Sequence, residues 1–122
     1  MDNIVNRPST ADLSLSLAKL LQEHKALDIL IINVGDVCSW TDFFIICTVR
    51  SSKHLSSLFI NIKKYLTELG IYSTSNSRHL DESGWLLLDY GDFVVHLMEY
   101  NQRKFYELEK LWFNGTIIYH SG

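Results

Sequence analysis

The chain has 122 residues, of which 47% are apolar and 20% are charged, and its formal net charge is −3. These values are those of one ordinary globular domain that buries a hydrophobic core without disulfide bonds. The mildly negative charge argues against non-specific binding to nucleic acid phosphates. We therefore expect a single domain over residues 1–122, with its core at roughly 10–113 and short tails.

The two cysteines, Cys38 and Cys47, show neither a disulfide framework nor the spacing of zinc ligands. The N-terminal residues lack the basic and apolar regions of a signal peptide, and no apolar run is long enough to span a membrane. We expect a cytoplasmic protein with reduced thiols that does not enter a membrane.

The first half of the chain predicts a helix followed by two buried strands. Ser9 and Asp12 have the spacing of a capping box, and the leucines that follow share one face of a helix. Residues 27–34 and 43–49 are almost continuous apolar runs rich in isoleucine. Such runs are typical of strands that are covered on both faces.

A second helix carries the strongest periodic signal. Apolar residues recur at steps of three and four from Leu55 to Leu69, after an N-cap at Ser51-Ser52 and before Gly70. The later elements are expected in this order: a strand at 72–75, a polar loop at 76–83, a hairpin with strands at 85–90 and 93–98 around a Gly91-Asp92 turn, a helix at 101–112, and a short tail at 116–122.

This order of elements predicts an α/β (α+β) fold, with a mixed sheet of about five strands packed against helices. The strand at 43–49, the helix after it and the strand at 72–75 predict a parallel pair of strands. The hairpin adds antiparallel strands to the same sheet.

Charge is divided unevenly along the chain. Residues 50–64 carry four Lys or Arg and no acid, whereas residues 80–99 carry five acids and no Lys or Arg. If both stretches are exposed, the molecule has a basic and an acidic face. The hairpin at 84–96 combines this acidity with aromatic residues, so it is either the wall of an active site or a surface for a basic partner.

An active site would be built from three carboxylates at strand ends. Asp42, Asp89 and Asp92 have the oxygen ligands that Mg²⁺ prefers, and a phosphate would lie at the helix start near Ser51-Ser52. However, the loop at 48–52 contains no glycine, and Asp89 and Asp92 straddle the turn instead of sharing a strand face. Roles in turns and helix caps explain these residues as well.

Two histidines are candidates for acid–base chemistry, but neither stands at a nucleophile's spacing from a serine or cysteine. His54 lies near the start of the second helix, and His96 lies between Val95 and Leu97. A hydrogen-bonded histidine within a sheet is the alternative interpretation of His96.

A surface for a partner would use one side of the strand at 85–90. Trp85, Leu87 and Asp89 point to one side of this strand, whereas Leu86, Leu88 and Tyr90 point to the other. We expect one of these sets to face a partner or a second subunit, with a simple two-sided core as the alternative.

Five stretches of the chain, in their order, resemble the ribosomal silencing factor family (RsfS, Iojap or YbeB-like proteins). They are residues 25–34, 41–48, 51–55, 84–96 and 103–112. The chain departs from the family at Val49-Arg50, where the family usually has a glycine, and at Lys53, where it usually has arginine. The valine makes a phosphate-binding loop less plausible, because valine resists positive φ.

The resemblance implies a small α/β domain that is similar to nucleotidyltransferases but without their activity, and therefore no enzyme, no cofactor and no metal. It implies binding to the large ribosomal subunit through ribosomal protein uL-fourteen, which blocks subunit joining and represses translation. It also implies a homodimer in the free state and no sequence-specific nucleic acid binding. A Mg²⁺-dependent nucleotidyltransferase and a large-subunit assembly factor remain the alternatives.

The resemblance and the acidity of the hairpin together define the expected contact residues. Trp85 and Tyr90 would supply buried contact area, and the acids would pair with Lys or Arg of the basic partner. Under this interpretation, replacement of Trp85 by alanine would weaken binding and leave the fold intact. The complete expected set is Trp85, Leu87, Asp89, Tyr90, Asp92 and Glu99.

Overall fold

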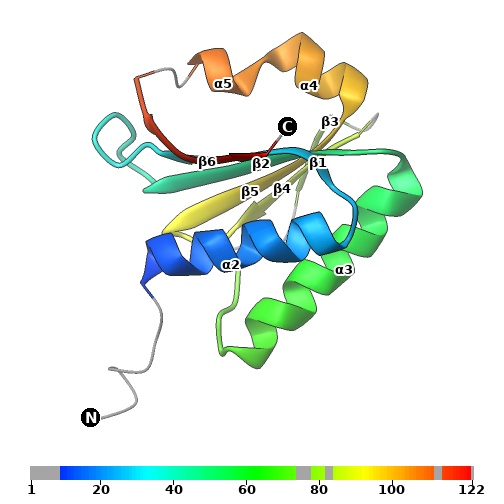
Figure 1. The fold of residues 1–122 in the computed structure, drawn as a ribbon, viewed down its shortest axis with the longest axis horizontal. Helices are drawn as coiled ribbons and strands as arrows, with labels where there is room; N and C mark the ends of the chain where they lie inside the picture. Colours follow the sequence, from blue (N-terminus) through cyan, green and yellow to red (C-terminus); the bar gives the residue numbers. More distant parts are fainter. Residues whose placement is uncertain (1–8, 74–77, 82–83, 112–113, 122) are drawn as a thin grey trace.

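The computed structural model describes residues 9–73, 78–81, 84–111 and 114–121 (Figure 1). A mixed β-sheet forms the central layer, with two long helices on one side and two short helices on the other (Figure 1). The helices are α2 (Thr10–Glu23), α3 (Ser52–Glu68), α4 (Tyr100–Tyr106) and α5 (Leu108–Leu111). The strands are β1 (Leu27–Asn33), β2 (Phe43–Val49), β3 (Arg78–Asp81), β4 (Trp85–Asp89), β5 (Phe93–Glu99) and β6 (Thr116–Ser121).

The strand order is β3-β4-β5-β2-β1-β6. Only β2 and β5 pair in parallel, and every other neighbouring pair is antiparallel. The predicted α/β fold with a mixed sheet is thus confirmed. The sheet has six strands, because residues expected to form a tail pair with β1 as β6. The parallel partner of β2 is β5, and not the strand that follows α3.

Three predictions for the second half of the chain are wrong. A strand lies at Arg78–Asp81, inside the expected loop, because it pairs with β4 at the edge of the sheet. Ile71–Ser73 form no strand, and the rest of the expected strand lies outside the described residues. The helix expected at 101–112 is divided, because Glu107 adopts a left-handed conformation with φ of 46°. Trp112 lies outside the described residues.

The ends of the long helices follow the predicted capping signals. The Ser9 hydroxyl accepts a hydrogen bond from the Asp12 amide, and the Ser51 hydroxyl accepts one from the His54 amide. The donor–acceptor distance is 3.1 Å in both. At the end of α3 the amide of Gly70 donates to Thr67 O and that of Ile71 donates to Leu66 O. This is a Schellman motif, with Gly70 at the positive φ of 78° that it requires.

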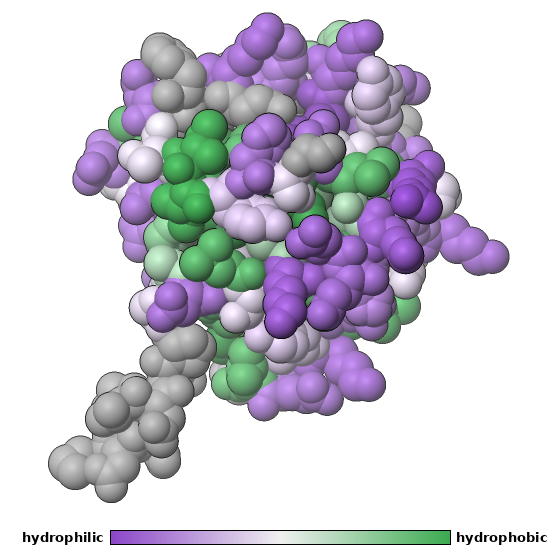
Figure 2. All heavy atoms as spheres, in the orientation of Figure 1, coloured by the Kyte–Doolittle hydropathy of each residue, from purple (hydrophilic) through white to green (hydrophobic). Residues whose placement is uncertain are grey.

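Hydrophobic residues fill both sides of the sheet. The larger cluster lies between the sheet and helices α2 and α3, and includes Leu17, Ile45 and Leu58. The second cluster lies on the side of α4 and α5, and includes Phe44 and Trp85. Figure 2 shows a largely hydrophilic surface in this view, with apolar side chains gathered on its left, over β6. None of the described helices is both long enough and apolar enough to cross a membrane.

Candidate docking surface

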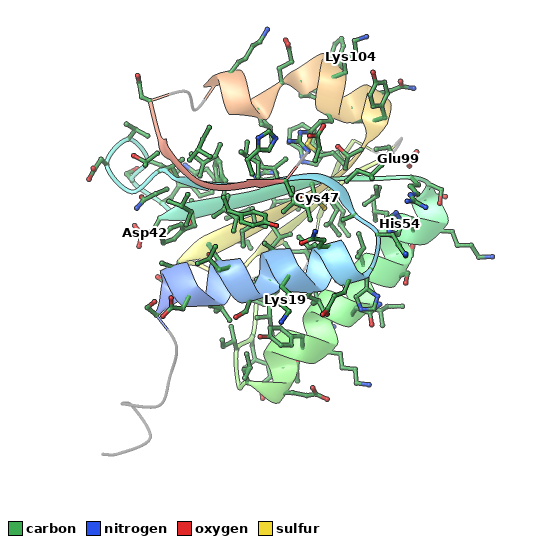
Figure 3. All side chains as sticks on the ribbon, viewed as in Figure 1. Lys19, Asp42, Cys47, His54, Glu99 and Lys104 are labelled. Atoms are coloured by element: carbon green, nitrogen blue, oxygen red, sulfur yellow. The ribbon has the colours of Figure 1, made fainter. Side chains whose placement is uncertain are left out.

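Strand β2 has an acidic residue before one end and a basic residue after the other. Asp42 immediately precedes β2 and Arg50 immediately follows it, so the strand separates their Cα atoms by about 26 Å. Figure 3 shows Asp42 at one end of the sheet and His54 and Glu99 at the other, so acidic residues lie at both ends. The sequence predicted a basic and an acidic face. The structure instead divides the acids of that stretch, with Asp89 and Asp92 at one end of the sheet and Glu99 at the other.

We define the acidic end as Asp36, Asp42, Asp89 and Asp92. Asp36 and Asp42 lie in the loop between β1 and β2, and Asp89 and Asp92 flank the turn between β4 and β5. Neither segment 33–43 nor segment 89–93 contains Lys or Arg. The Asp42 amide donates to Asp92 O over 3.1 Å, which joins the two segments. Asp36, Asp42 and Asp92 are exposed, so their carboxylates are available to a basic partner.

Asp89 has a structural role in the turn. Its Oδ1 accepts a hydrogen bond from the Gly91 amide over 2.9 Å, and the Tyr90 amide donates to Phe93 O over 3.0 Å. Gly91 has a φ of 85°, which a residue with a side chain adopts only with strain. Asp89 therefore holds the shape of the turn that presents Asp92.

Trp85 and Leu87 are buried, with exposed fractions of 8% and 6%. The Trp85 indole packs on Tyr106 of α4 with ring centroids 4.6 Å apart, and its Nε1 donates to Nδ1 of His96. The expectation that these two side chains offer open contact area is wrong for this structure. They lie on the sheet side that α4 and α5 cover, which strand alternation cannot reveal.

Tyr90 lies on the other side of the sheet, as alternation along β4 predicted. Its ring stacks on Phe93 at a centroid distance of 5.2 Å, and it is half-buried against the core beneath α2 and α3. Burial raises the pKa of its hydroxyl, which therefore remains a hydrogen-bond donor at neutral pH. Tyr90 and Asp92 are the aromatic and the acidic side chain that the hairpin presents together.

Glu99 does not belong to this group. It ends β5 and is paired with Val49, whereas Asp92 precedes the start of the same strand. Its side chain lies over Gly84, where an added Cβ would come within 2.6 Å of its Oε2. The six expected contact residues therefore do not form one continuous surface. The candidate docking surface is the acidic end with Tyr90.

The three carboxylates of the metal hypothesis do not assemble. Within the described residues, no group of three or more His, Cys, Asp or Glu side chains is arranged to hold a metal ion. Asp42 and Asp92 are exposed, and Asp89 holds the turn. No observation in this region therefore favours the nucleotidyltransferase alternative.

The histidines are engaged in structural hydrogen bonds. His96 accepts from Trp85, and burial, with a smaller effect of the Arg103 charge, lowers its pKa to about 3. Nδ1 of His54 accepts from the Arg50 amide, and its Nε2 lies 2.8 Å from His24 O, so His54 connects the start of α3 to the end of α2. Burial raises the pKa of the Cys47 thiol to about 12, so it carries no thiolate at neutral pH.

Sequence reasoning missed a pocket beside Tyr90. It is about 270 Å³ in volume and lies between the start of α2, the end of α3 and the hairpin turn. Its walls come from three segments that are far apart in the chain.

The fold and these side chains define a small α/β protein whose candidate site is an exposed acidic surface. A model of the family described as "Ribosomal silencing factor during starvation" matches residues 7–120. The chain therefore belongs to the ribosomal silencing factor family, as its sequence motifs indicated.

Similarity to individual proteins supports this family assignment. The chain is 35% identical over 95 residues to a ribosomal silencing factor of Bacillus subtilis, covering 78% of this chain and 80% of that protein. It is 36% identical over 98 residues to a Mus musculus protein named for mitochondrial assembly of the ribosomal large subunit, covering 79% of this chain and 43% of that protein. A crystal structure of a Chromobacterium violaceum protein superposes with a TM-score of 0.75 at 28% identity, covering 83% and 84% of the two chains.

Proposed function

We propose that this chain binds the large ribosomal subunit through protein uL-fourteen, blocks joining of the small subunit and thereby represses translation in the cytoplasm. Membership in the silencing factor family supports the ribosome as the target. The observation that carries the mode of binding is the exposed acidic end, which contains no Lys or Arg. Carboxylates are repelled by RNA phosphates, so this surface favours a basic protein over ribosomal RNA.

Steric exclusion needs no chemistry at the bound surface. A protein that is bound to the joining face of a subunit blocks the other subunit by occupying space. How effectively it does so depends on where it binds and on its residence time. The neutral buried His96, the protonated Cys47 thiol and the dispersed carboxylates are in keeping with such a role. The exposed residues at the acidic end are then the functional residues.

Subunit reassociation tests this proposal. Separated subunits are mixed with the protein at raised Mg²⁺, and the fraction of joined ribosomes is read from a sucrose gradient. We expect the wild-type chain to lower this fraction when it is preincubated with large subunits. If the protein is instead preincubated with small subunits and the unbound protein is then removed, the fraction of joined ribosomes should not change. Undiminished joining in the presence of excess protein would refute the proposed block.

A role in large-subunit assembly is the second candidate, and the name of the mouse relative is the observation that favours it. The two roles predict different consequences of depletion. Loss of a joining repressor leaves mature large subunits and raises translation during starvation. Loss of an assembly factor leads to incomplete large subunits during growth, which a gradient profile of depleted cells would show.

Self-association of the free chain is part of the proposal. Strand β6 lies at an edge of the sheet, where no described strand pairs with its outer side, and it exposes 61% of Ile117 and 36% of Ile118. Exposed edges of this kind pair readily with a second chain. Mass measurement in solution should give a dimer, and Ile117→Lys should shift it toward a monomer. A wild-type monomer at all concentrations would exclude this part.

A further inference from the structure

The pocket beside Tyr90 has aliphatic and aromatic side chains in its wall and an acidic rim. Ile71 contributes apolar surface, the rings of Tyr90 and Tyr72 add aromatic surface, and Asp92 supplies an exposed carboxylate. None of the described lining residues is Lys or Arg. The pocket is therefore suited to a group that is apolar along its length and positive at its tip.

The backbone around the pocket favours the same charge. The C-terminus of α3 ends at this pocket, and its last turn contains no basic residue. A helix C-terminus carries a partial negative charge, which favours cations. The start of α2 also lines the pocket and has the opposite polarity, but Asp12 in its first turn offsets that positive end. Gly70 leaves this wall open, since a Cβ there would meet no atom within 4 Å.

We infer that this pocket receives a single basic side chain, best an arginine, from the protein on which the acidic end docks. This inference rests on the proposed function. The aliphatic stem packs on Ile71, the guanidinium stacks on the tyrosine rings, and Asp92 accepts its hydrogen bonds. Arginine fits better than lysine, because its planar group stacks on aromatic faces and pairs with a carboxylate through two hydrogen bonds.

A pair of charge-reversal variants separates a specific pocket from general electrostatics. Asp92→Lys and Glu23→Lys change the net charge equally at exposed positions, but Glu23 ends α2 at the opposite end of the sheet. Binding to purified large subunits should fall at least about tenfold for Asp92→Lys and less than about twofold for Glu23→Lys. Asp92→Asn should show an intermediate loss. Equal binding by the Asp92→Lys and Glu23→Lys variants would overturn the inference, whatever the wild-type affinity.

A second measurement does not depend on the ribosome. N-acetyl-arginine amide is titrated into the ¹⁵N-labelled chain, with N-acetyl-norleucine amide as the uncharged control probe. We expect concentration-dependent amide shifts at Gly70, Ile71, Gly91 and Asp92 with the arginine probe, and their loss in the Asp92→Lys variant. Shifts that are absent, or equal for both probes, would overturn the pocket assignment. If the wild-type chain fails to bind large subunits but these shifts occur, the proposed function fails and the basic-side-chain pocket stands.

Discussion

The indole Nε1 of Trp85 donates a hydrogen bond to Nδ1 of His96 over 3.0 Å, within the buried side of the sheet that α4 covers. Because Nδ1 accepts this bond, the neutral imidazole carries its proton on Nε2, which is buried and has no hydrogen-bond partner among the described residues. The bond joins β4 to β5 across their antiparallel pairing. The most conspicuous aromatic residue of the hairpin therefore stabilises the fold that supports the docking surface.

Replacement of Trp85 should destabilise the protein. Trp85→Phe removes the donor and leaves Nδ1 of His96 without its partner, which should cost about 1–3 kcal/mol of unfolding free energy. Trp85→Ala also opens a cavity and should cost about 3–5 kcal/mol. Urea unfolding measures both values. Phe105→Ala, at a side chain that is 79% exposed, is the control and should change stability by less than about 0.5 kcal/mol.

Stability should fall in acid because of His96. Burial, with the charge of Arg103 adding to it, lowers the pKa of this histidine from 6.5 to about 3. Between these two pKa values the unfolded state binds one more proton than the folded state. The contribution of His96 to the free energy of unfolding is therefore complete above about pH 6.5. It is lost by up to about 1.4 kcal/mol per pH unit as the pH decreases. Between pH 4.5 and 6.5 the unfolding free energy should therefore depend less steeply on pH in the His96→Leu variant than in the wild type. Parallel slopes would contradict the assignment.

Arg103 should anchor α4 to the sheet. Its Nη1 donates to Asp28 O over 2.8 Å and to Thr48 Oγ1 over 3.1 Å, and the side chain is buried. Arg103→Met keeps the aliphatic stem but removes these donors, and should cost about 1.5–3 kcal/mol by chemical denaturation. Lys104→Met, at the exposed neighbouring position, is the matched control. Equal stabilities of the two variants would show that Arg103 is not an anchor.

Cys47 should be unreactive in the native protein. The side chain is fully buried and its pKa is raised to about 12, so almost no thiolate forms at pH 8. In a Cys38→Ser background, iodoacetamide should label Cys47 only as rapidly as the protein unfolds. The labelling rate should therefore rise with urea concentration. Labelling at the rate of a free thiol in buffer alone would contradict the burial.

Elements with strong local signals were predicted closely. The helix of residues 52–68 follows from its apolar steps and from Gly70, and β2 has the predicted bounds because its apolar run is bounded by polar residues. The two serine caps were also predicted, since a cap depends on neighbouring residues alone. These features are local, and their physical causes lie within a few residues.

The features that sequence reasoning missed depend on contacts between distant segments. Strand β6 exists because β1 offers it a partner, and β3 is a short edge strand paired with β4. The burial of Trp85 depends on the placement of α4, and the separation of Glu99 from Asp92 depends on the direction of β5. The hairpin's acidity was evident from the sequence, but the side chains that share its surface were not.

Sedimentation of the purified chain with separated ribosomal subunits tests the central claim most directly. We predict that the wild-type chain sediments with large subunits and not with small subunits, and that Asp92→Lys reduces this association while Glu23→Lys retains it. Association that weakens with added salt would agree with a charged contact. Sedimentation with small subunits, or with neither subunit, would contradict the account.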